Sequence, residues 1–137
     1  MTNQGMDYEE FRQRGVPACF IAMEGEIIAY HEESHELTCS FPVKAEYLNP
    51  MQGMQGGFIA AAIDNVFGPL SLLAGGKPSA TVQMQVMYHR PVKMGDNLVI
   101  TSRVLKRGRK LLSMEAQALN GDGELVANAS STWMYVV

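Results

Sequence analysis

The chain lacks the features that mark secreted and membrane proteins. With only two cysteines among 137 residues, Cys19 and Cys39, it cannot build a disulfide framework, and we interpret both as reduced thiols. Its first 15 residues are polar and lack the basic and then apolar pattern of a signal peptide. The longest apolar run, residues 55–76, is interrupted by Pro69 and bounded by glycine pairs, so we expect it not to span a bilayer. These absences predict a cytoplasmic protein without a membrane partner.

Basic residues are also too few for a nucleic-acid-binding protein, because the formal net charge is -3. Their distribution is nevertheless uneven. Eight of the 11 lysines and arginines lie between residues 77 and 110, where Asp96 is the only acidic residue. Two interpretations stay open, a solvated strand face and a binding surface for a ligand that carries several phosphates.

The composition is that of a folded globular protein, with 47% hydrophobic and 18% charged residues. A chain of 137 residues suffices for a core of its own, so we expect a single domain over residues 1–137. Residues 1–23 would form a short helix at 7–14, with acidic residues in its first turn, and a lead-in to the rest.

Alternation of apolar and polar residues predicts six strands, near residues 24–30, 36–43, 81–88, 98–107, 110–119 and 125–135. In the third strand Val82, Met84, Val86 and Tyr88 would share one face, with Thr81 on the other. Residues 120–123, Asn-Gly-Asp-Gly, are a strong hairpin signal. Strands joined by hairpins give an antiparallel sheet.

One long helix is predicted over residues 55–76, which are apolar on nearly every side and must therefore be buried on nearly every side. Pro69 should kink this helix or end its regular part near Gly68. One long central helix wrapped by a curved antiparallel sheet of about six strands is an α+β domain. The edges of such a sheet need cover, so we expect a homo-oligomer.

Asp64 is the one ionisable residue of this helix and our first candidate for catalysis. A buried carboxylate is costly unless it is paired or useful. The alternative is an aspartate that hydrogen-bonds a neighbouring backbone group.

Gln55, Gly56 and Gly57 form the expected start of the helix, where unpaired N–H groups and the macrodipole favour negative charge and could polarise a carbonyl oxygen. The alternative is a flexible junction. Asp64 lies eight residues beyond Gly56, or about 12 Å along one helix. A two-fold partner with an antiparallel helix would bring Asp64 of one subunit towards Gly56 of the other, so the site would need a dimer.

His31 and His35 belong to a literal H-E-x-x-H string, which on a helix would indicate a zinc site. Here strand-like segments flank the string, so we interpret it as a turn between strands. No third ligand is evident, and we expect no metal site.

A set of residues in a fixed order resembles the hotdog-fold acyl-CoA thioesterases, of the phenylacetate-pathway and 4-hydroxybenzoyl-CoA thioesterase type. The matching residues are Asn49, Gln55-Gly56-Gly57, Asp64, Thr81, Tyr88-x-Arg90-Pro91, Gly95-Asp96, Gly108-Arg109 and Asp122-Gly123. The resemblance runs from about residue 24 to the C-terminus. It implies a hotdog fold, a dimer whose two sheets join, often within a tetramer, and an active site between subunits.

The resemblance also implies roles for particular residues. Asp64 would be the general base or nucleophile, the Gly56 amide would bind the thioester carbonyl oxygen, Asn49 would orient substrate or water, and Thr81 would lie near the carboxylate. The candidates for contacts with coenzyme A are Gly57, Arg90, Arg107, Arg109 and Lys110. No cofactor is implied beyond the coenzyme A of the substrate.

Gln55 departs from the pattern, because family members usually carry histidine before the glycine pair. A glutamine amide can still donate a hydrogen bond to the carbonyl, but it cannot become a cation. The predicted function is hydrolysis of an acyl-CoA to free acid and CoA. The alternatives are a non-catalytic acyl-CoA-binding domain, which Gln55 motivates, a hydratase, which would need a catalytic histidine, and an interaction domain. The acyl group, the choice between coenzyme A and a carrier protein, and the choice between dimer and tetramer stay open.

Overall fold

The computed structural model describes residues 5–136, so residues 1–4 and 137 of the expected domain lie outside the described residues. The elements are α1 (Tyr8–Arg14), α2 (Ala18–Ala22), β1 (Glu26–His31), β2 (Glu36–Pro42), a 3₁₀ turn (Ala45–Tyr47), α3 (Gly56–Gly75), β3 (Ser79–Tyr88), β4 (Asn97–Arg107), β5 (Leu111–Leu119) and β6 (Leu125–Tyr135). The predicted order of two strands, a long helix and four strands is confirmed.

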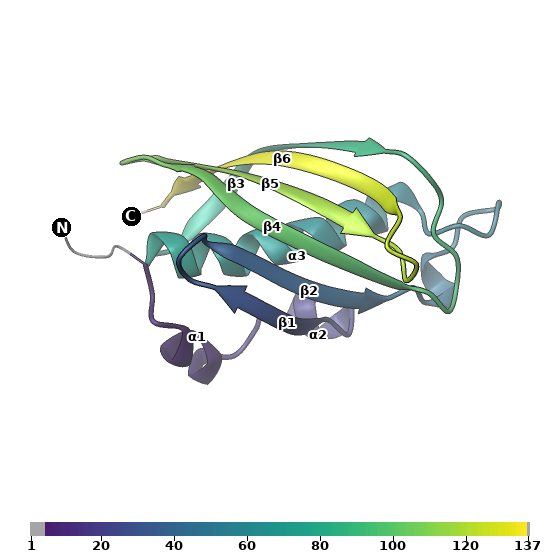
Figure 1. Ribbon diagram of the computed structural model, residues 1–137, viewed down its shortest axis with the longest axis horizontal. Helices are drawn as coiled ribbons and strands as arrows, with labels where there is room; N and C mark the ends of the chain where they lie inside the picture. The colour runs from purple at the N-terminus through teal and green to yellow at the C-terminus, as the bar shows by residue number, and fades with distance from the viewer. Residues whose placement is uncertain (1–4, 137) are drawn as a thin grey trace.

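The six strands form one antiparallel sheet in the order β1-β2-β4-β5-β6-β3, which curves around α3 (Figure 1). Every neighbouring pair except β2–β4 and β6–β3 is a hairpin of consecutive strands. Both exceptions are joined by longer connections, and that between β2 and β4 includes α3 and β3. The predicted α+β fold class is therefore confirmed, with β3 at an edge of the sheet.

The core lies between α3 and the concave face of the sheet. Ile63, Phe67 and Leu70 of α3 are fully buried, as are Leu37 and Phe41, which alternate on the inner face of β2. Full burial of such a side chain stabilises the fold by about 1.5–3 kcal/mol. The alternation in the sequence of β2 predicted this inner face correctly.

Helix α3 runs through Pro69 to Gly75 and ends at Gly76, whose φ of 77° is left-handed. Of the two effects expected of Pro69, a kink or an end of the regular part near Gly68, the second is wrong. A proline lacks the N–H of one helical hydrogen bond, but Leu70 and Leu73, which follow it, are buried against the sheet. Their burial offsets the lost bond.

By length and composition alone α3 could cross a bilayer, because it has 20 residues and a mean hydropathy of 1.5. The argument that Pro69 interrupts the apolar run therefore fails. In the fold, 61% of that apolar window is buried, as is typical of a core helix.

A bulge in β3 changes the expected faces of this strand. Thr81 pairs with Trp133 and Gln83 with Thr132, which leaves Val82 as an extra residue. Val82 is consequently exposed while Met84 and Val86 pack on the core. The prediction that Val82 shares a face with Met84 is wrong, because one inserted residue reverses the period-two pattern.

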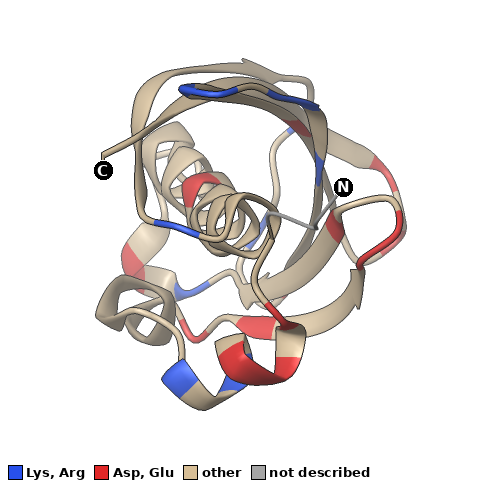
Figure 2. Ribbon diagram, turned by 90° about the vertical axis from the view of Figure 1, so that its left-hand side faces the viewer, with Lys and Arg blue, Asp and Glu red and all other residues tan. Residues whose placement is uncertain are grey.

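Residues 5–23 cross the side of α3 that the sheet leaves open (Figure 2). The Asp7 carboxylate caps α1 by accepting from the Glu10 N–H, 3.2 Å away. Helix α2 was missed in the sequence, because its five residues are too short to show a helical period. Hydrogen bonds near both ends tie this lead-in to α3. The Met6 N–H donates to the Leu73 carbonyl (2.8 Å), and the Cys19 thiol donates to the Asn65 Oδ1 (3.1 Å). The Asn65 Nδ2 in turn donates to the Cys19 carbonyl (3.5 Å) and to the Met23 sulfur (3.4 Å).

Candidate active site

Asp64 lies half-buried on α3, on the side that faces the edge strand β3. Its Oδ1 accepts a hydrogen bond of 3.2 Å from the Thr81 hydroxyl. Burial raises the pKa of the Asp64 carboxyl above its ordinary value, and the Thr81 hydrogen bond acts in the opposite direction. The carboxylate is therefore a stronger base than a solvated aspartate, and the β3 bulge is what aims Thr81 at it.

The first turn of α3 presents two free backbone donors. The N–H groups of Gly56 and Gly57 have no hydrogen-bond partner among residues 5–136, whereas those of Phe58 and Ile59 both donate to the Gln55 carbonyl. Unpaired amides at a helix N-terminus attract a negative charge or a polarised oxygen. This turn can bind a thioester carbonyl oxygen as it becomes negative.

Tyr88 fixes the orientation of this turn. The sequence placed Tyr88 on a strand face and among the residues of the family resemblance, but it did not predict this role. Its hydroxyl donates to the Gly56 carbonyl over 2.6 Å, and burial raises the pKa of the phenol. A Cβ on Gly56 would lie 3.1 Å from the Tyr88 ring, so glycine permits this close approach. The signal in the sequence was the place of Tyr88 at the end of a strand, three residues before Pro91.

Gln55 precedes α3 and is exposed, and its side chain makes no capping hydrogen bond. Its backbone N–H donates to the Tyr47 carbonyl at 2.8 Å, which holds the entry to the helix. A Cβ built on Gly57 would lie 3.0 Å from the Gln55 Oε1. The Gln55 side chain thus lies beside the first turn of α3.

Asn49 closes the loop before α3. Its Oδ1 accepts from the N–H groups of Met51 (3.0 Å) and Gly53 (3.1 Å). The oxygen of this side chain is therefore engaged in the loop, and its Nδ2 has no hydrogen-bond partner within residues 5–136. As a contact to substrate or water, Asn49 can act only as a donor.

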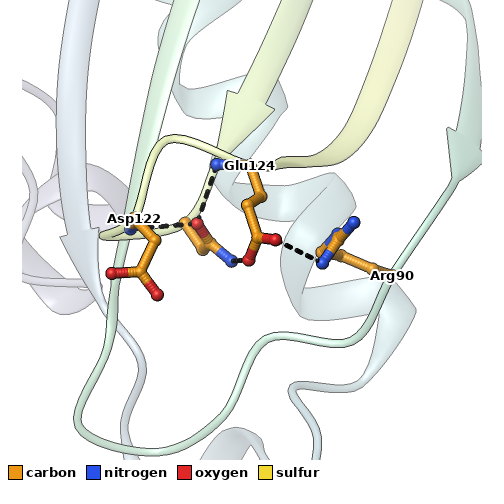
Figure 3. A network of polar contacts seen from close by, with 4 residues as sticks. Arg90, Asp122 and Glu124 are labelled. Carbon is orange, nitrogen blue, oxygen red and sulfur yellow. Dashed lines mark hydrogen bonds and ion pairs between the residues drawn. The ribbon is translucent and has the colours of Figure 1, made fainter.

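The basic residues between 77 and 110 do not form one continuous surface. Arg90 forms an ion pair of 2.8 Å with Glu124, in a network at the β5–β6 hairpin that Asn120 also joins (Figure 3). Arg103 pairs with Glu115 on the next strand. The partners of both arginines lie beyond residue 110, which is why the local sequence showed only one opposing charge.

Arg107 lies at the C-terminal end of α3, where its Nη1 donates to the Ala74 carbonyl over 2.6 Å. Beyond it, Lys106, Arg109 and Lys110 line a small surface hollow of about 330 Å³ at the β4–β5 turn. These three cations have no ion pair with the described carboxylates, those of residues 5–136. Three cations without such ion pairs gather at this hollow, which can therefore bind an anion.

His31 ends β1 and His35 lies in the following turn, as the flanking strands predicted. The Nδ1 of His35 is 3.4 Å from the Tyr30 hydroxyl. Residues 5–136 contain no group of three or more His, Cys, Asp or Glu side chains placed to hold a metal ion.

A cavity of about 580 Å³ adjoins Asp64 between α3 and the lead-in. Its walls are mostly apolar, with Trp133 from β6 and Leu72 from α3 among them. The lead-in contributes Phe11 and Val16. A long apolar group placed next to the carboxylate would find room here.

Within one chain the two reactive parts of the site do not meet. Thr81 is brought to Asp64, and Tyr88 to Gly56, but eight residues of α3 separate the carboxylate from the free amides by about 12 Å. A carbonyl on the Gly56 amide is thus out of reach of Asp64 in the same chain.

Comparison with known proteins identifies the class that this fold and site define. The sequence model described as the Thioesterase superfamily matches residues 52–127. Acyl-coenzyme A thioesterase 13 of Homo sapiens is 31% identical over 111 residues, which cover 79% of this chain and 79% of that protein. A phenylacetic acid degradation-related protein of Ralstonia eutropha JMP134 superposes with a TM-score of 0.83 at 30% identity, covering 93% of this chain and 99% of that one.

The PaaI protein of the E. coli phenylacetic acid degradation operon shares the fold, with a TM-score of 0.84 at 20% identity over 94% of this chain and 91% of that one. The hotdog fold expected from the resemblance is confirmed. The chain belongs to the thioesterase superfamily, and it is a thioester hydrolase.

Proposed function

We propose that this protein hydrolyses acyl-CoA thioesters to the free acid and coenzyme A, with Asp64 as the base or nucleophile. The observation that carries the proposal is that α3 holds both a half-buried carboxylate of raised pKa, Asp64, and two free amides at its first turn. The name of the human relative supports coenzyme A as the thiol.

In the proposed reaction, the substrate carbonyl oxygen accepts from the Gly56 amide, which stabilises negative charge as water attacks. Asp64 removes a proton from that water as the new C–O bond forms. The C–S bond then breaks, and the thiolate of CoA leaves and takes up a proton. The alternative route, in which Asp64 itself attacks and the resulting anhydride is hydrolysed, gives the same products.

The 12 Å between Asp64 and Gly56 leads us to place each active site between two subunits. The edge strand β3 is free to pair with β3 of a second copy, which would join the two sheets. Val82 and Met87, exposed at 57% and 61%, would be covered by that contact. With antiparallel α3 helices, Asp64 of one subunit faces Gly56 of the other.

The same arrangement suits the hollow lined by Lys106, Arg109 and Lys110 for binding the phosphate end of the substrate. Gly75 lies eleven residues beyond Asp64, so the C-terminal end of α3 is about 16 Å from the carboxylate. Lys106, Arg109 and Lys110, together with Arg107, lie just beyond that end. We therefore assign the phosphates of coenzyme A to the basic residues of the subunit that supplies Asp64, with the pantetheine arm spanning the distance.

The test is thiol release from aliphatic and aromatic acyl-CoAs by the wild-type protein and by Asp64→Asn. Loss of a general base lowers the rate by about 10²–10⁴-fold, while folding and CoA binding should persist. Thr81→Val serves as a graded variant, since it removes one hydrogen bond to the carboxylate and keeps the side-chain size. Unchanged turnover in Asp64→Asn would refute the mechanism. Tight binding of acyl-CoA by the wild type without turnover would favour a binding domain, and Gln55→His would then be the variant to assay.

A further inference from the structure

The cavity beside Asp64 follows α3 for about two turns of the helix. Asp64, Gly68 and Leu72 all line it, and they recur every four residues, so they lie on one face of the helix. From Asp64 to Leu72 the cavity extends about 12 Å along the helix axis. The lead-in covers this length, tied down by Met6 at Leu73 and by Cys19 at Asn65.

Gly68 keeps the cavity open one turn beyond the carboxylate. A Cβ added at Gly68 would lie 3.6 Å from the Trp133 ring, an ordinary van der Waals distance. Close packing against Trp133 therefore does not demand glycine here, although glycine in a helix interior costs stability. Its backbone also relieves the crowding that Pro69 causes, but that effect concerns the helix and not the size of a bound group.

The lining of the cavity favours an uncharged, extended occupant. Phe11, Val16 and Leu72 are apolar, and Trp133 closes the side towards the sheet. The one cation among the lining residues, Arg14, is more than half exposed and already lies 3.7 Å from Glu10. An extended aliphatic chain fills a long apolar channel better than a single flat ring does.

We propose that the acyl group of the substrate passes over Gly68 and lies between α3 and the lead-in, so that Gly68 and Leu72 set the preference for medium-length aliphatic chains. This inference rests on the proposed function, because the thioester carbon must lie at Asp64 for the chain to enter the cavity at Gly68. It assigns Phe11 and Val16 of the lead-in to the outer wall of the acyl site.

The first experiment compares kcat/KM for butyryl-, octanoyl-, decanoyl- and phenylacetyl-CoA in wild type, Gly68→Val and Leu72→Ala. Gly68→Val should lower kcat/KM at least tenfold for octanoyl- and decanoyl-CoA, and less than threefold for butyryl-CoA, which ends before Gly68. Leu72→Ala should shift the optimum to longer chains. The control is Ala18→Val, which places the same valine side chain at an exposed lead-in position that does not line the cavity.

An equal loss for all four substrates in Gly68→Val would overturn the proposal, since a disturbed helix lowers every rate alike. Preferred hydrolysis of phenylacetyl-CoA over every aliphatic substrate would overturn the assignment of the chain class.

The second experiment tests whether the acyl chain occupies the cavity, and it does not require hydrolysis. Cys19 is exposed and lines the cavity, whereas Cys39 is buried and its pKa is raised to about 12, so iodoacetamide should label Cys19 alone. In Asp64→Asn protein, decanoyl-CoA should slow this labelling several-fold, while CoA and butyryl-CoA should not. Unprotected Cys19 in protein saturated with decanoyl-CoA would overturn the proposal.

The two experiments separate the possible failures. If no acyl-CoA is hydrolysed by the wild type, the proposed function fails, and labelling of Cys19 still reports whether the cavity takes the chain. If turnover depends on Asp64 but neither Gly68→Val nor decanoyl-CoA has the expected effect, the proposed function stands and the acyl path is wrong.

Discussion

The two ends of α3 differ in whether their terminal backbone groups have hydrogen-bond partners. At the C-terminal end three successive carbonyls are satisfied: Leu72 by the Gly76 N–H, Leu73 by the Met6 N–H and Ala74 by Arg107. At the N-terminal end the amides of Gly56 and Gly57 have no partner within residues 5–136, and Gln55 supplies no side-chain cap.

The contrast separates the end that maintains the fold from the end that serves the chemistry. Unsatisfied groups at a helix terminus cost stability unless water, a side chain or a ligand takes them up. The chain brings one partner from the lead-in and another from β4 to the C-terminal end, but it leaves the N-terminal donors open where Tyr88 holds the turn in place. A donor that must bind substrate cannot also be capped.

Among changes at the two ends of α3, the largest effect is expected from deleting one open donor. Gly56→Pro removes the N–H without disturbing the backbone, because proline is accepted at the first position of a helix and Gln55 already has the ψ of 141° that a following proline requires. Loss of one such donor lowers kcat by about 10²–10³-fold. The measurement is kcat for the best acyl-CoA substrate.

Gly56→Ala is the matched control for this variant. It introduces a Cβ at the same 3.1 Å from the Tyr88 ring but retains the N–H. We expect it to lose much less activity than Gly56→Pro. Equal losses in the two variants would mean that crowding at Tyr88, and not the missing donor, limits the reaction.

A smaller effect is expected at the closed end, and on stability instead of chemistry. Arg107→Gln weakens a charge-assisted hydrogen bond to the Ala74 carbonyl, where a cation also favours the helix dipole. The loss should be about 1–2 kcal/mol in the free energy of unfolding, measured by urea denaturation. The value of kcat at saturating substrate should be unchanged, because Arg107 would contact only the phosphates of coenzyme A. Arg103→Gln is the control, since its exposed ion pair is worth about 0–1 kcal/mol. A fall in kcat for Arg107→Gln without loss of stability would contradict the division between the two ends.

The smallest effect concerns how the free energies of unfolding of the wild type and of Asp64→Asn depend on pH. Here the sign of the difference is the prediction. Burial raises the pKa of Asp64 in the folded state, so the folded protein binds a proton more tightly than the unfolded chain does. The unfolding free energy of the wild type should therefore decline as pH rises from the ordinary aspartate pKa through the raised one.

Asparagine does not titrate, and it can still accept from Thr81. The variant should consequently be more stable than wild type at neutral pH, and its advantage should shrink at acid pH, below the ordinary pKa of aspartate. Thermal unfolding at a series of pH values checks this expectation. A wild type that is more stable than the variant at neutral pH would mean that the carboxylate has a stabilising partner.

Much of the fold could be predicted because the alternation is strong. The inner face of β2 and the buried length of α3 follow directly from where apolar residues recur. The continuation of α3 past Pro69 could not be predicted from the neighbouring residues in the sequence, since the burial of Leu70 and Leu73 outweighs the lost hydrogen bond. The side of the sheet on which Val82 lies could not be predicted from the sequence either, because a bulge is a property of two paired strands and not of one.

For the site, the sequence pointed to Asp64, Gly56 and Thr81 by helix position and family resemblance. It could not show that Arg90 is neutralised by Glu124, because the two residues are 34 positions apart. It also could not show the cavity over Gly68, which forms only when the lead-in folds back on α3.

The sequence by itself determined the long helix, the six strands and the class of protein, because the local periodicity and the ordered motif both lie along the chain. Only the tertiary structure decided which groups are free to act. The β3 bulge turned Thr81 towards Asp64. The carbonyls at the C-terminal end of α3 gained partners, while the amides of Gly56 and Gly57 gained none within residues 5–136. Ion pairs with distant glutamates neutralised Arg90 and Arg103. Each of these depends on contacts between distant segments, since the reactivity of a carboxylate, an amide or a cation is set by what lies beside it in space.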